Sequence, residues 1–397
     1  MVVHVFNTSL VSGPETLVWP ALAVARFDVQ IIWLKESRVA LDKQTHVEQY
    51  LGQLGLSYKV IEVNSRWDKN AIRKLRQILE DVQQNIQIAH AHDVKASVFL
   101  LSAVRAMKQK KPLLVSTHHG VRARSLVRAA LYEKYYSYFI LPHYDLVLSV
   151  CSDDREILLR RGLQPERVKV HLNGVTRHFI AESERNEIQK NIREQWVIEN
   201  NEARQLKNNF LIFGIVARVE EGKRHDLLLE VIYEIKKRKP EMNFQVICFG
   251  RGSLLSKMQL KTKKMNLQEQ VLWMGYRPNL GEEFAGFDAL ISFSKAEGLP
   301  INLIEAGWAA TPVFACAVDG VKDLIPNSNL GDLFSVDEPF HSLVDKFLNF
   351  AQSHEQLRKK GLLFQDWVTK NFSQKKWLEQ LEAYYINLTR ESFNKKR

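Results

Sequence analysis

The feature that most constrains this chain is a regular alternation of short apolar runs with longer amphipathic stretches. In the first half the apolar runs cover residues 2–6, 29–34, 58–63, 86–92, 112–119, 146–150 and 168–172. Stretches with apolar residues at helical spacing separate them, as over 70–85. Strands that alternate with helices predict βαβ units around a buried parallel sheet.

The alternation stops near residue 180 and resumes after 209. The segment 181–209 is polar, rich in charge and helical in pattern. Further strands are predicted over 210–217, 244–250, 271–275, 289–294 and 312–316. Because 397 residues exceed what one core usually serves, we predict two α/β, Rossmann-like domains joined through 181–209, over 1–176 and 177–372. Open parallel sheets bind ligands at the carboxyl ends of their strands, so the predicted site is a central cleft that both sheets face.

Composition excludes several classes of protein. Apolar residues make up 45% of the chain and charged residues 25%, which argues against wholesale disorder. Cys151, Cys248 and Cys316 lie far apart, without the spacing of a zinc site or a disulfide framework, and indicate buried thiols in a reducing compartment. No basic leader and no run of about 18 apolar residues occurs, so we expect a soluble, cytoplasmic protein.

The positive charge is concentrated in the first half of the chain. Residues 1–180 contain 25 Lys and Arg against 16 Asp and Glu, an excess of nine. The formal charge of the whole chain is +11, so residues 181–397 contribute an excess of only two. Such an excess suggests a surface that meets nucleic acid, phospholipid or a phosphorylated substrate. A basic nucleic-acid-binding protein is therefore one alternative, although no zinc-finger spacing, basic-zipper heptad or RNA-binding strand motif supports it.

Two cations follow the predicted strand 210–217. Arg218 and Lys223 lie five positions apart in a loop that leads into a helical pattern. Cations beside a helix N-terminus favour a phosphate ligand, because their charge adds to the free N–H groups and the helix dipole. The alternative is a solvated loop.

The stretch 295–308, KAEGLPINLIEAGW, places two carboxylates around another strand-to-helix turn. Glu297 lies on the loop and Glu305 in the first turns of a helix that Pro300 suits as a start. Gly298 allows backbone amides to approach a ligand. Carboxylates only accept hydrogen bonds, which suits sugar hydroxyls. The alternative is that both glutamates simply stabilise the positive end of the helix.

Five ordered blocks of the second half resemble a known family. The stretch from Glu297 to Glu305 resembles the E-x7-E motif of retaining glycosyltransferases with the GT-B fold, specifically glycosyltransferase family 4. ARVEEGKRHDLLLE (217–230) resembles that family's G-R-L-x-x-E-K-G-x-D-x-L block. FGRGSL (249–254) resembles its GxGP turn and MGYRPN (274–279) its base-contacting loop. FACAVDGVKDLI (314–325) resembles its G-G-V-x-E-[LI]-[IV] segment.

The first half resembles the same family more loosely. FNTSLVSGPETL (6–17) is similar to its G-G-x-E loop around Gly13, with one glycine lost. STHHG (116–120) is similar to T-x-H-G, which makes His119 the better candidate for the family's active-site histidine and His118 the alternative. The resemblance also implies that the C-terminal helix, 373–397, packs back on the first domain.

The resemblance implies transfer of a sugar, with retention at the anomeric carbon, from a UDP- or GDP-sugar to an acceptor. The implied catalytic residues are His119, Glu297, Arg218 and Lys223. The implied donor-binding residues are Gly13, Arg218, Lys223, Gly250, Tyr276, Arg277, Glu297, Gly298, Leu299, Pro300 and Glu305. Among them, Glu305 would hold the ribose and Glu297 the donated sugar. Since no Asp-x-Asp pair occurs, we expect neither a metal nor any cofactor beyond the donor.

Basic and aromatic residues are interleaved just after the candidate histidines. The stretch 120–139 holds Arg122, Arg124, Arg128 and Lys134, and 105–111 adds a second basic cluster. This pattern suggests an anionic or membrane-facing acceptor surface, and hence a lipid-linked or lipopolysaccharide-type acceptor and a peripheral contact with the inner face of the membrane. The alternative is a solvated helix with its aromatics in the core. A nucleotide-sugar epimerase of the same fold and a pseudoenzyme that binds donor without turnover are also compatible with these motifs.

Overall fold

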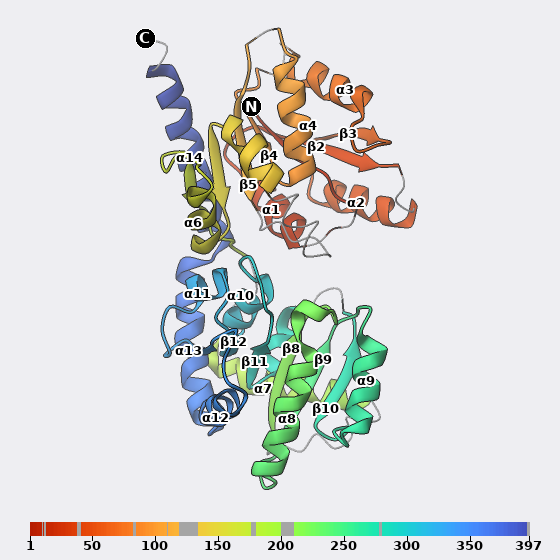
Figure 1. Ribbon diagram of the computed structural model, residues 1–397, viewed down its shortest axis with the longest axis vertical. Helices are drawn as coiled ribbons and strands as arrows, with labels where there is room; N and C mark the ends of the chain where they lie inside the picture. The colour runs from red at the N-terminus through yellow and green to blue at the C-terminus, as the bar shows by residue number, and fades with distance from the viewer. Residues whose placement is uncertain are drawn as a thin grey trace. The chain divides into compact units, whose positions relative to one another are not determined.

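The chain folds into two compact α/β units. The computed structural model describes residues 1–9, 11, 13–37, 41–81, 85–108, 110–118, 134–175, 180–199, 210–277 and 280–394. Unit 1 comprises residues 1–174 and 374–397, and unit 2 comprises 175–373 (Figure 1). Each unit is built on one parallel sheet, which confirms the predicted fold class.

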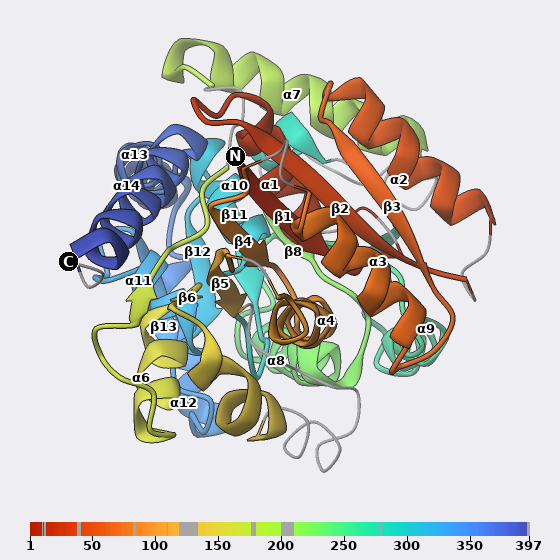
Figure 2. The same cartoon turned by 90° about the horizontal axis from the view of Figure 1, so that it is seen from above.

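The sheet of unit 1 has seven parallel strands in the order β3-β2-β1-β4-β5-β6-β7. They are β1 (Val2–Phe6), β2 (Val29–Glu36), β3 (Tyr58–Val63), β4 (Ile88–Ala91), β5 (Leu113–His118), β6 (Leu146–Ser149) and β7 (Val168–Val170). Figure 2 shows β1, β2 and β3 running side by side, as their hydrogen bonding requires. Every residue of β1, β4 and β6 is buried, since helices cover both faces of a parallel sheet.

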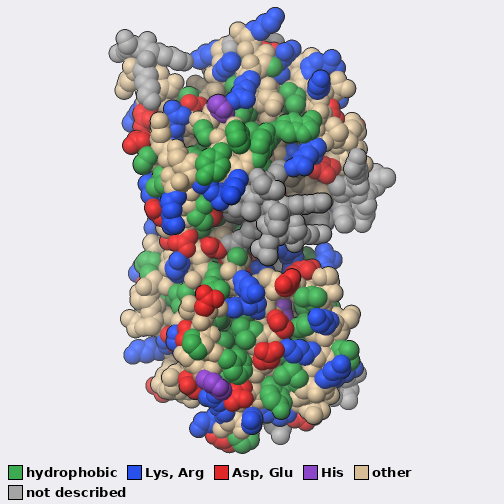
Figure 3. Space-filling view, in the orientation of Figure 1, with side chains coloured by type: hydrophobic (Ala, Val, Ile, Leu, Met, Phe, Trp, Pro, Cys, Tyr) green, Lys and Arg blue, Asp and Glu red, His purple; other side chains and the backbone are tan. Residues whose placement is uncertain are grey.

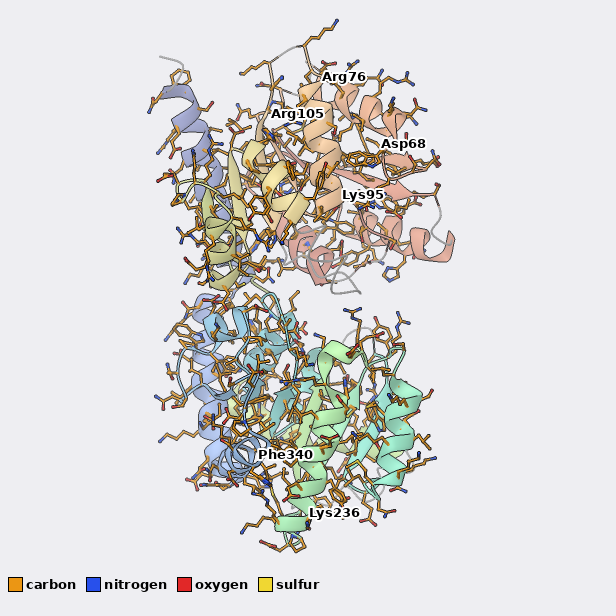
Figure 4. All side chains as sticks on the ribbon, viewed as in Figure 1. Asp68, Arg76, Lys95, Arg105, Lys236 and Phe340 are labelled. Carbon is orange, nitrogen blue, oxygen red and sulfur yellow. The ribbon has the colours of Figure 1, made fainter. Side chains whose placement is uncertain are left out.

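Helices alternate with these strands. They are α1 (Gly13–Ala23), α2 (Leu41–Gln53), α3 (Lys69–Leu79), α4 (Val94–Arg105) and α6 (Ser152–Arg160), with short turns at η2 (Tyr136–Ile140) and η3 (Leu141–His143). Asp68 begins α3 by accepting hydrogen bonds from the N–H groups of Asn70 and Ala71. Figure 4 labels this aspartate and also Lys95, whose Nζ lies 2.7 Å from Glu36 Oε1 and joins α4 to the end of β2.

The C-terminal helix α14 (Gln374–Asn394) belongs to unit 1. The Trp377 ring stacks on the His171 ring with centroids 4.8 Å apart. The Tyr385 hydroxyl, fully inside the core, lies 2.6 Å from His90 Nδ1. The last helix therefore completes the core of the unit that the N-terminus begins.

The sheet of unit 2 has six parallel strands in the order β10-β9-β8-β11-β12-β13. They are β8 (Leu211–Val216), β9 (Phe244–Phe249), β10 (Val271–Gly275), β11 (Ala289–Ser292), β12 (Val313–Cys316) and β13 (Gly331–Phe334). The helices are α7 (Glu182–Glu199), α8 (His225–Arg238), α9 (Leu255–Lys264), α10 (Ile301–Trp308), α11 (Gly320–Leu324), α12 (Phe340–Phe350) and α13 (His354–Asn371), with short turns at η5 (Glu221–Lys223) and η6 (Gly281–Gly286). The sequence did not predict β13, because its four residues, GDLF, carry no apolar run.

Helix α7 is an integral part of unit 2. Trp196 is fully buried, and its ring stacks on Phe287 with centroids 5.1 Å apart. Arg193 donates to Asp288 Oδ2 at 2.8 Å. The segment 181–209 was predicted to join the two domains and to lie within the bounds 177–372 of the second; α7 packs into the core of unit 2, and residues 200–209 lie outside the described part. No helix in the described ranges combines the length and apolarity needed to cross a bilayer.

Candidate active site

The loops after β8, β9, β11 and β12 meet at one edge of the sheet of unit 2. Because the strands are parallel, their carboxyl ends all reach this edge. The Lys295 N–H donates to the Gly222 carbonyl at 2.9 Å, which joins the loop after β11 to the loop after β8. This edge carries Arg218, Lys223, Gly250, Glu297 and Gly298, which the sequence had predicted from separate motifs.

The loop after β8 is fixed by Arg224, which no sequence motif marks as a site residue. Arg224 is 8% exposed, with a left-handed backbone at φ 51. Its guanidinium donates to the carbonyls of Phe293 at 2.6 Å and Val336 at 3.1 Å, and to Cys316 Sγ at 3.3 Å. Arg224 thus ties the loop to the ends of three other strands. Nothing in the sequence distinguishes it from a solvated arginine.

Arg218 and Lys223, the two predicted phosphate ligands, have different environments. Arg218 is exposed and makes no ion pair with any residue that the structure describes. Lys223 donates from Nζ to Glu297 Oε1, and the two side chains are 21% and 17% exposed. The cation predicted for the diphosphate therefore contacts the carboxylate predicted for the sugar. Any phosphate that binds Lys223 has to compete with Glu297 for it.

Two glycines allow the loops after β8 and β9 to cross. At Gly250 the backbone has φ +155, and a Cβ would lie 1.9 Å from the Ala217 carbonyl oxygen. At Gly252 a Cβ would lie 2.3 Å from the Val219 carbonyl oxygen. Glu220 reinforces the crossing by accepting hydrogen bonds from the N–H group of Ser253 at 3.2 Å and from its hydroxyl at 2.7 Å. The position of Arg218 therefore depends on the absence of side chains in the next loop.

The loop after β10 presents an exposed aromatic ring. Tyr276 is 54% exposed, and the Arg251 guanidinium lies 4.2 Å from its ring centroid. Arg277, predicted beside it at the base, instead pairs with Glu283 and lies 5.2 Å from the Phe249 ring centroid. Burial raises the pKa of Glu283 from its ordinary value. Tyr276 thus offers a face for a planar ligand, whereas Arg277 is engaged in holding its own loop.

Helix α10 carries the second carboxylate of the E-x7-E pattern. Leu299 is 4% exposed, and Pro300 directly precedes the helix. Asn302 donates from Nδ2 to the Val216 carbonyl at 2.8 Å, which holds the start of α10 against the end of β8. Glu305 lies in the second turn and is partly buried. Glu297 and Glu305 therefore flank the N-terminus of one helix, where unpaired N–H groups also favour anionic ligands.

The turn after β12 also supports the Glu297 loop. Asp319 Oδ2 accepts a hydrogen bond from the Glu297 N–H at 2.9 Å. The Gly320 N–H donates to the Gly298 carbonyl at 3.0 Å. Nothing in the sequence places Asp319 at this site, since only the folded backbone brings it to Glu297.

Other predicted residues belong to unit 1. Gly13 begins α1. His118 ends β5, is 2% exposed, and has its Nδ1 at 3.6 Å from Asp154 Oδ2. His119 lies outside the described residues, as do Arg122, Arg124 and Arg128.

The described residues contain one group of side chains with the composition of a metal site, His4, His90 and His92. Several of their nitrogens are hydrogen-bonded: His4 Nδ1 lies 2.8 Å from His92 Nε2, within the group, and His90 lies within hydrogen-bonding distance of Tyr385 and Thr117. The His90 and His92 rings stack at 4.0 Å. Burial lowers the pKa of His4 to about 3. These features fit a neutral, hydrogen-bonded stack in the core better than ligands that converge on a cation.

Comparison with protein families gives two matches along the chain. The family described as "Glycosyltransferase Family 4" matches residues 20–179, and "Glycosyl transferases group 1" matches residues 197–363. A relative in Bacillus subtilis, the putative glycosyltransferase EpsF, is 25% identical over 353 residues, which cover 84% of this chain and 85% of the relative. The Escherichia coli UDP-Gal:alpha-D-GlcNAc-diphosphoundecaprenol alpha-1,3-galactosyltransferase is 23% identical over 288 residues, 71% of this chain and 69% of that protein.

The fold also matches solved structures. Anabaena Alr3699/HepE, crystallised in complex with UDP, superposes with a TM-score of 0.76. The match covers 97% of this chain and 99% of that one, at 15% sequence identity. Similarity at this level of identity establishes the shared architecture.

Proposed function

Because this chain belongs to the glycosyltransferases with family 4 and group 1 domains and the GT-B fold, we propose that it uses a nucleotide-diphosphate sugar, UDP- or GDP-linked, as its donor. The observation that carries the proposal is the direct contact of Lys223 with Glu297, beside the exposed Arg218. A phosphate-binding cation and a hydroxyl-binding carboxylate on adjacent loops match the two chemical parts of such a donor.

Each group has a proposed task. Arg218 and Lys223 stabilise the charge that develops on the diphosphate as it leaves. Losing one positioned donor of this kind typically costs about 2.7 to 4 kcal/mol of transition-state stabilisation. Glu305 accepts from the ribose hydroxyls and Glu297 from hydroxyls of the donated sugar. Tyr276 offers its exposed face to the base.

We further propose that transfer proceeds with retention and without a metal. A retaining mechanism with two carboxylates needs an acid and a nucleophile about 5 to 5.5 Å apart on either side of the bond. Glu297 instead pairs with a cation, and Glu305 is assigned to the ribose end. Front-face displacement, with the leaving phosphate helping to deprotonate the acceptor, fits these roles better. His119 is the proposed histidine at the reacting sugar, and cationic side chains take the place of a metal.

The proposed acceptor is a lipid-linked glycan or a cell-surface polysaccharide precursor. The E. coli relative is named for a diphosphoundecaprenol acceptor. Unit 1 also has exposed aromatics on η2, with Tyr138 at 49% and Phe139 at 64%, and in the sequence these residues follow the basic stretch that begins at residue 120. On the face shown in Figure 3, basic and acidic side chains are interspersed over unit 2. We therefore propose a peripheral contact with anionic lipid through unit 1. Vesicle flotation at low salt tests this contact, and failure to float rejects it.

A thermal-shift panel of UDP-, GDP- and ADP-sugars tests the donor. The preferred donor should raise the melting temperature of the wild type by mass action, and Arg218→Ala and Glu305→Ala should lose much of that rise. Lys239→Ala and Glu241→Ala are matched controls, because both residues are exposed in unit 2 and pair only weakly, at 3.8 Å.

Product analysis separates sugar transfer from the competing activities. Nuclear magnetic resonance of the product should show the anomeric configuration of the donor. Conversion of the sugar nucleotide without any acceptor would indicate an epimerase. Binding of random duplex DNA without any response to sugar nucleotides would instead favour a nucleic-acid-binding protein.

A further inference from the structure

The turn after β12 holds a strained residue next to the candidate site. Asp319 has φ 35 and ψ −123, a combination that residues with a Cβ rarely adopt. In the family pattern that 314–325 resembles, G-G-V-x-E, glycine stands at this position. A strained backbone of this kind persists only where the surrounding structure compensates for it, and such residues cluster at functional sites.

The side chain of Asp319 makes a contact that glycine cannot make. Its Oδ2 accepts a hydrogen bond from the Glu297 N–H at 2.9 Å. The next residue, Gly320, donates its N–H to the Gly298 carbonyl at 3.0 Å. Asp319 and Gly320, in the turn after β12, therefore hold Glu297 and Gly298, in the loop after β11.

Helix capping does not account for the aspartate. Asp319 precedes α11, but its side chain makes no capping hydrogen bond to that helix. Its hydrogen bond to Glu297 instead spans 22 positions of sequence and joins the end of β12 to the loop after β11. That loop is in turn bonded to the loop after β8, through the Lys295 N–H and through the pair of Glu297 with Lys223.

We propose that Asp319 is a positioning residue for the transfer reaction: it holds the backbone of Glu297 so that the carboxylate meets the donated sugar. This inference rests on the role proposed above for Glu297. Asp319 touches neither donor nor acceptor in this scheme. It acts through Glu297, and the backbone strain at residue 319 is the cost of placing a hydrogen-bond acceptor there.

Three variants test the inference by separating strain from hydrogen bonding. Asp319→Gly removes both, Asp319→Ala removes only the hydrogen bond, and Asp319→Asn keeps an acceptor oxygen and tolerates positive φ. We expect kcat to fall about tenfold to a hundredfold in the glycine and alanine variants, because small misplacements of reacting groups are costly. The asparagine variant should stay within about threefold of wild type. In the glycine and alanine variants the dissociation constant for UDP should stay the same or fall, because a displaced Glu297 competes less for Lys223, so the loss should lie in kcat and not in nucleotide binding.

Thermal stability should follow a different order. Asp319→Gly should melt about 2 to 4 °C above Asp319→Ala, since glycine relieves the strain that alanine retains. Asn266→Gly is the matched control: Asn266 has φ 55 and is exposed at the end of α9, so its melting temperature should change without any change in kcat.

Wild-type kcat in Asp319→Gly, or a kcat that follows melting temperature across the variants, would overturn the inference. Glu297→Gln is measured alongside to locate a failure. If Glu297→Gln leaves transfer intact, the proposed role of Glu297 fails. If Glu297→Gln impairs transfer and Asp319→Gly does not, only the role of Asp319 fails.

Discussion

Replacing Glu297 with glutamine should tighten the binding of nucleoside diphosphate while slowing sugar transfer. Lys223 Nζ donates to Glu297 Oε1, so a diphosphate has to displace that carboxylate to reach the cation. Glutamine removes the competing charge with little change in volume. It also weakens the acceptor that the donated sugar needs. The two measurements should therefore move in opposite directions.

The size of the first effect follows from the burial of the pair. With 21% and 17% of the side chains exposed, the Lys223–Glu297 contact lies between two known regimes. Exposed pairs contribute about 0.2 to 1 kcal/mol, and hydrogen bonds to charged groups about 1.5 to 3 kcal/mol. After discounting for the remaining solvent exposure, we expect the Lys223–Glu297 pair to contribute about 1 to 2 kcal/mol. Since about 1.4 kcal/mol corresponds to tenfold in affinity, UDP should bind Glu297→Gln about 5 to 30 times more tightly.

The second effect follows from the charge at the donated sugar. A charge-assisted hydrogen bond that strengthens in the transition state is worth about 2.7 to 4 kcal/mol, so kcat should fall about a hundredfold or more. Isothermal titration calorimetry with UDP and steady-state kinetics with the preferred donor measure the two effects. Glu241→Gln is the matched control, because Glu241 is 70% exposed and its nearest cation is 3.8 Å away.

Unchanged or weaker UDP binding in Glu297→Gln would refute this reasoning. It would mean that Lys223 does not reach the phosphates, or that the ion pair persists when the nucleotide binds. Lys223→Gln separates these cases. It should lose UDP affinity if Lys223 contacts phosphate, and it should keep that affinity if the lysine serves only to hold Glu297.

Three further predictions concern pH, packing and metals. Burial lowers the pKa of His4 to about 3 and those of His171 and His225 to about 4, from 6.5. Below pH 6.5 these histidines bind protons in the unfolded chain but stay neutral in the folded chain. The free energy of unfolding should therefore fall by about 2 kcal/mol per histidine between pH 7 and pH 5. Urea unfolding midpoints that stay constant over this range would contradict the prediction. In Gly250→Ala, the rise in melting temperature on adding donor should be mostly lost while the circular dichroism spectrum stays normal, because the new Cβ would lie 1.9 Å from the Ala217 carbonyl oxygen. An unaltered rise would show that the loop adapts. Sugar transfer should persist in excess EDTA. If EDTA abolishes transfer and added Mg²⁺ restores it, metal independence is rejected.

Most of the fold was predictable from the sequence because apolar runs in a parallel sheet are buried on both faces and stand out against amphipathic helices. Strand β13 was not, since burial of its ends depends on neighbours rather than on its own composition. The packing of helix α7 was not predictable for a related reason. Its polar surface suggested a connection, and only the fold shows that Trp196 packs against Phe249 and Phe287.

Only part of the candidate site was predictable from the sequence. The positions of Arg218, Lys223 and Glu297 were predictable because the loops that follow buried parallel strands lie at the carboxyl edge of the sheet. The contacts of Arg224 and Asp319 were not, because each depends on a backbone conformation and on partners distant in sequence. Arg277 shows the converse: its position was expected, but its pair with Glu283 was not.

Strain is concentrated next to the candidate site in unit 2. Among the described residues of this unit, the non-glycine residues with positive φ are Arg224, Asn266, Ala310 and Asp319. Arg224 adjoins Lys223, and Asp319 bonds to the backbone of Glu297, so two of the four directly support the two members of one ion pair. Such conformations cost free energy in the folded chain and are kept where rigid placement of a neighbour compensates. The loops that carry Lys223 and Glu297 are therefore built to hold their positions before the donor arrives, and the ion pair between them is the part of this edge that has to change when a phosphate binds.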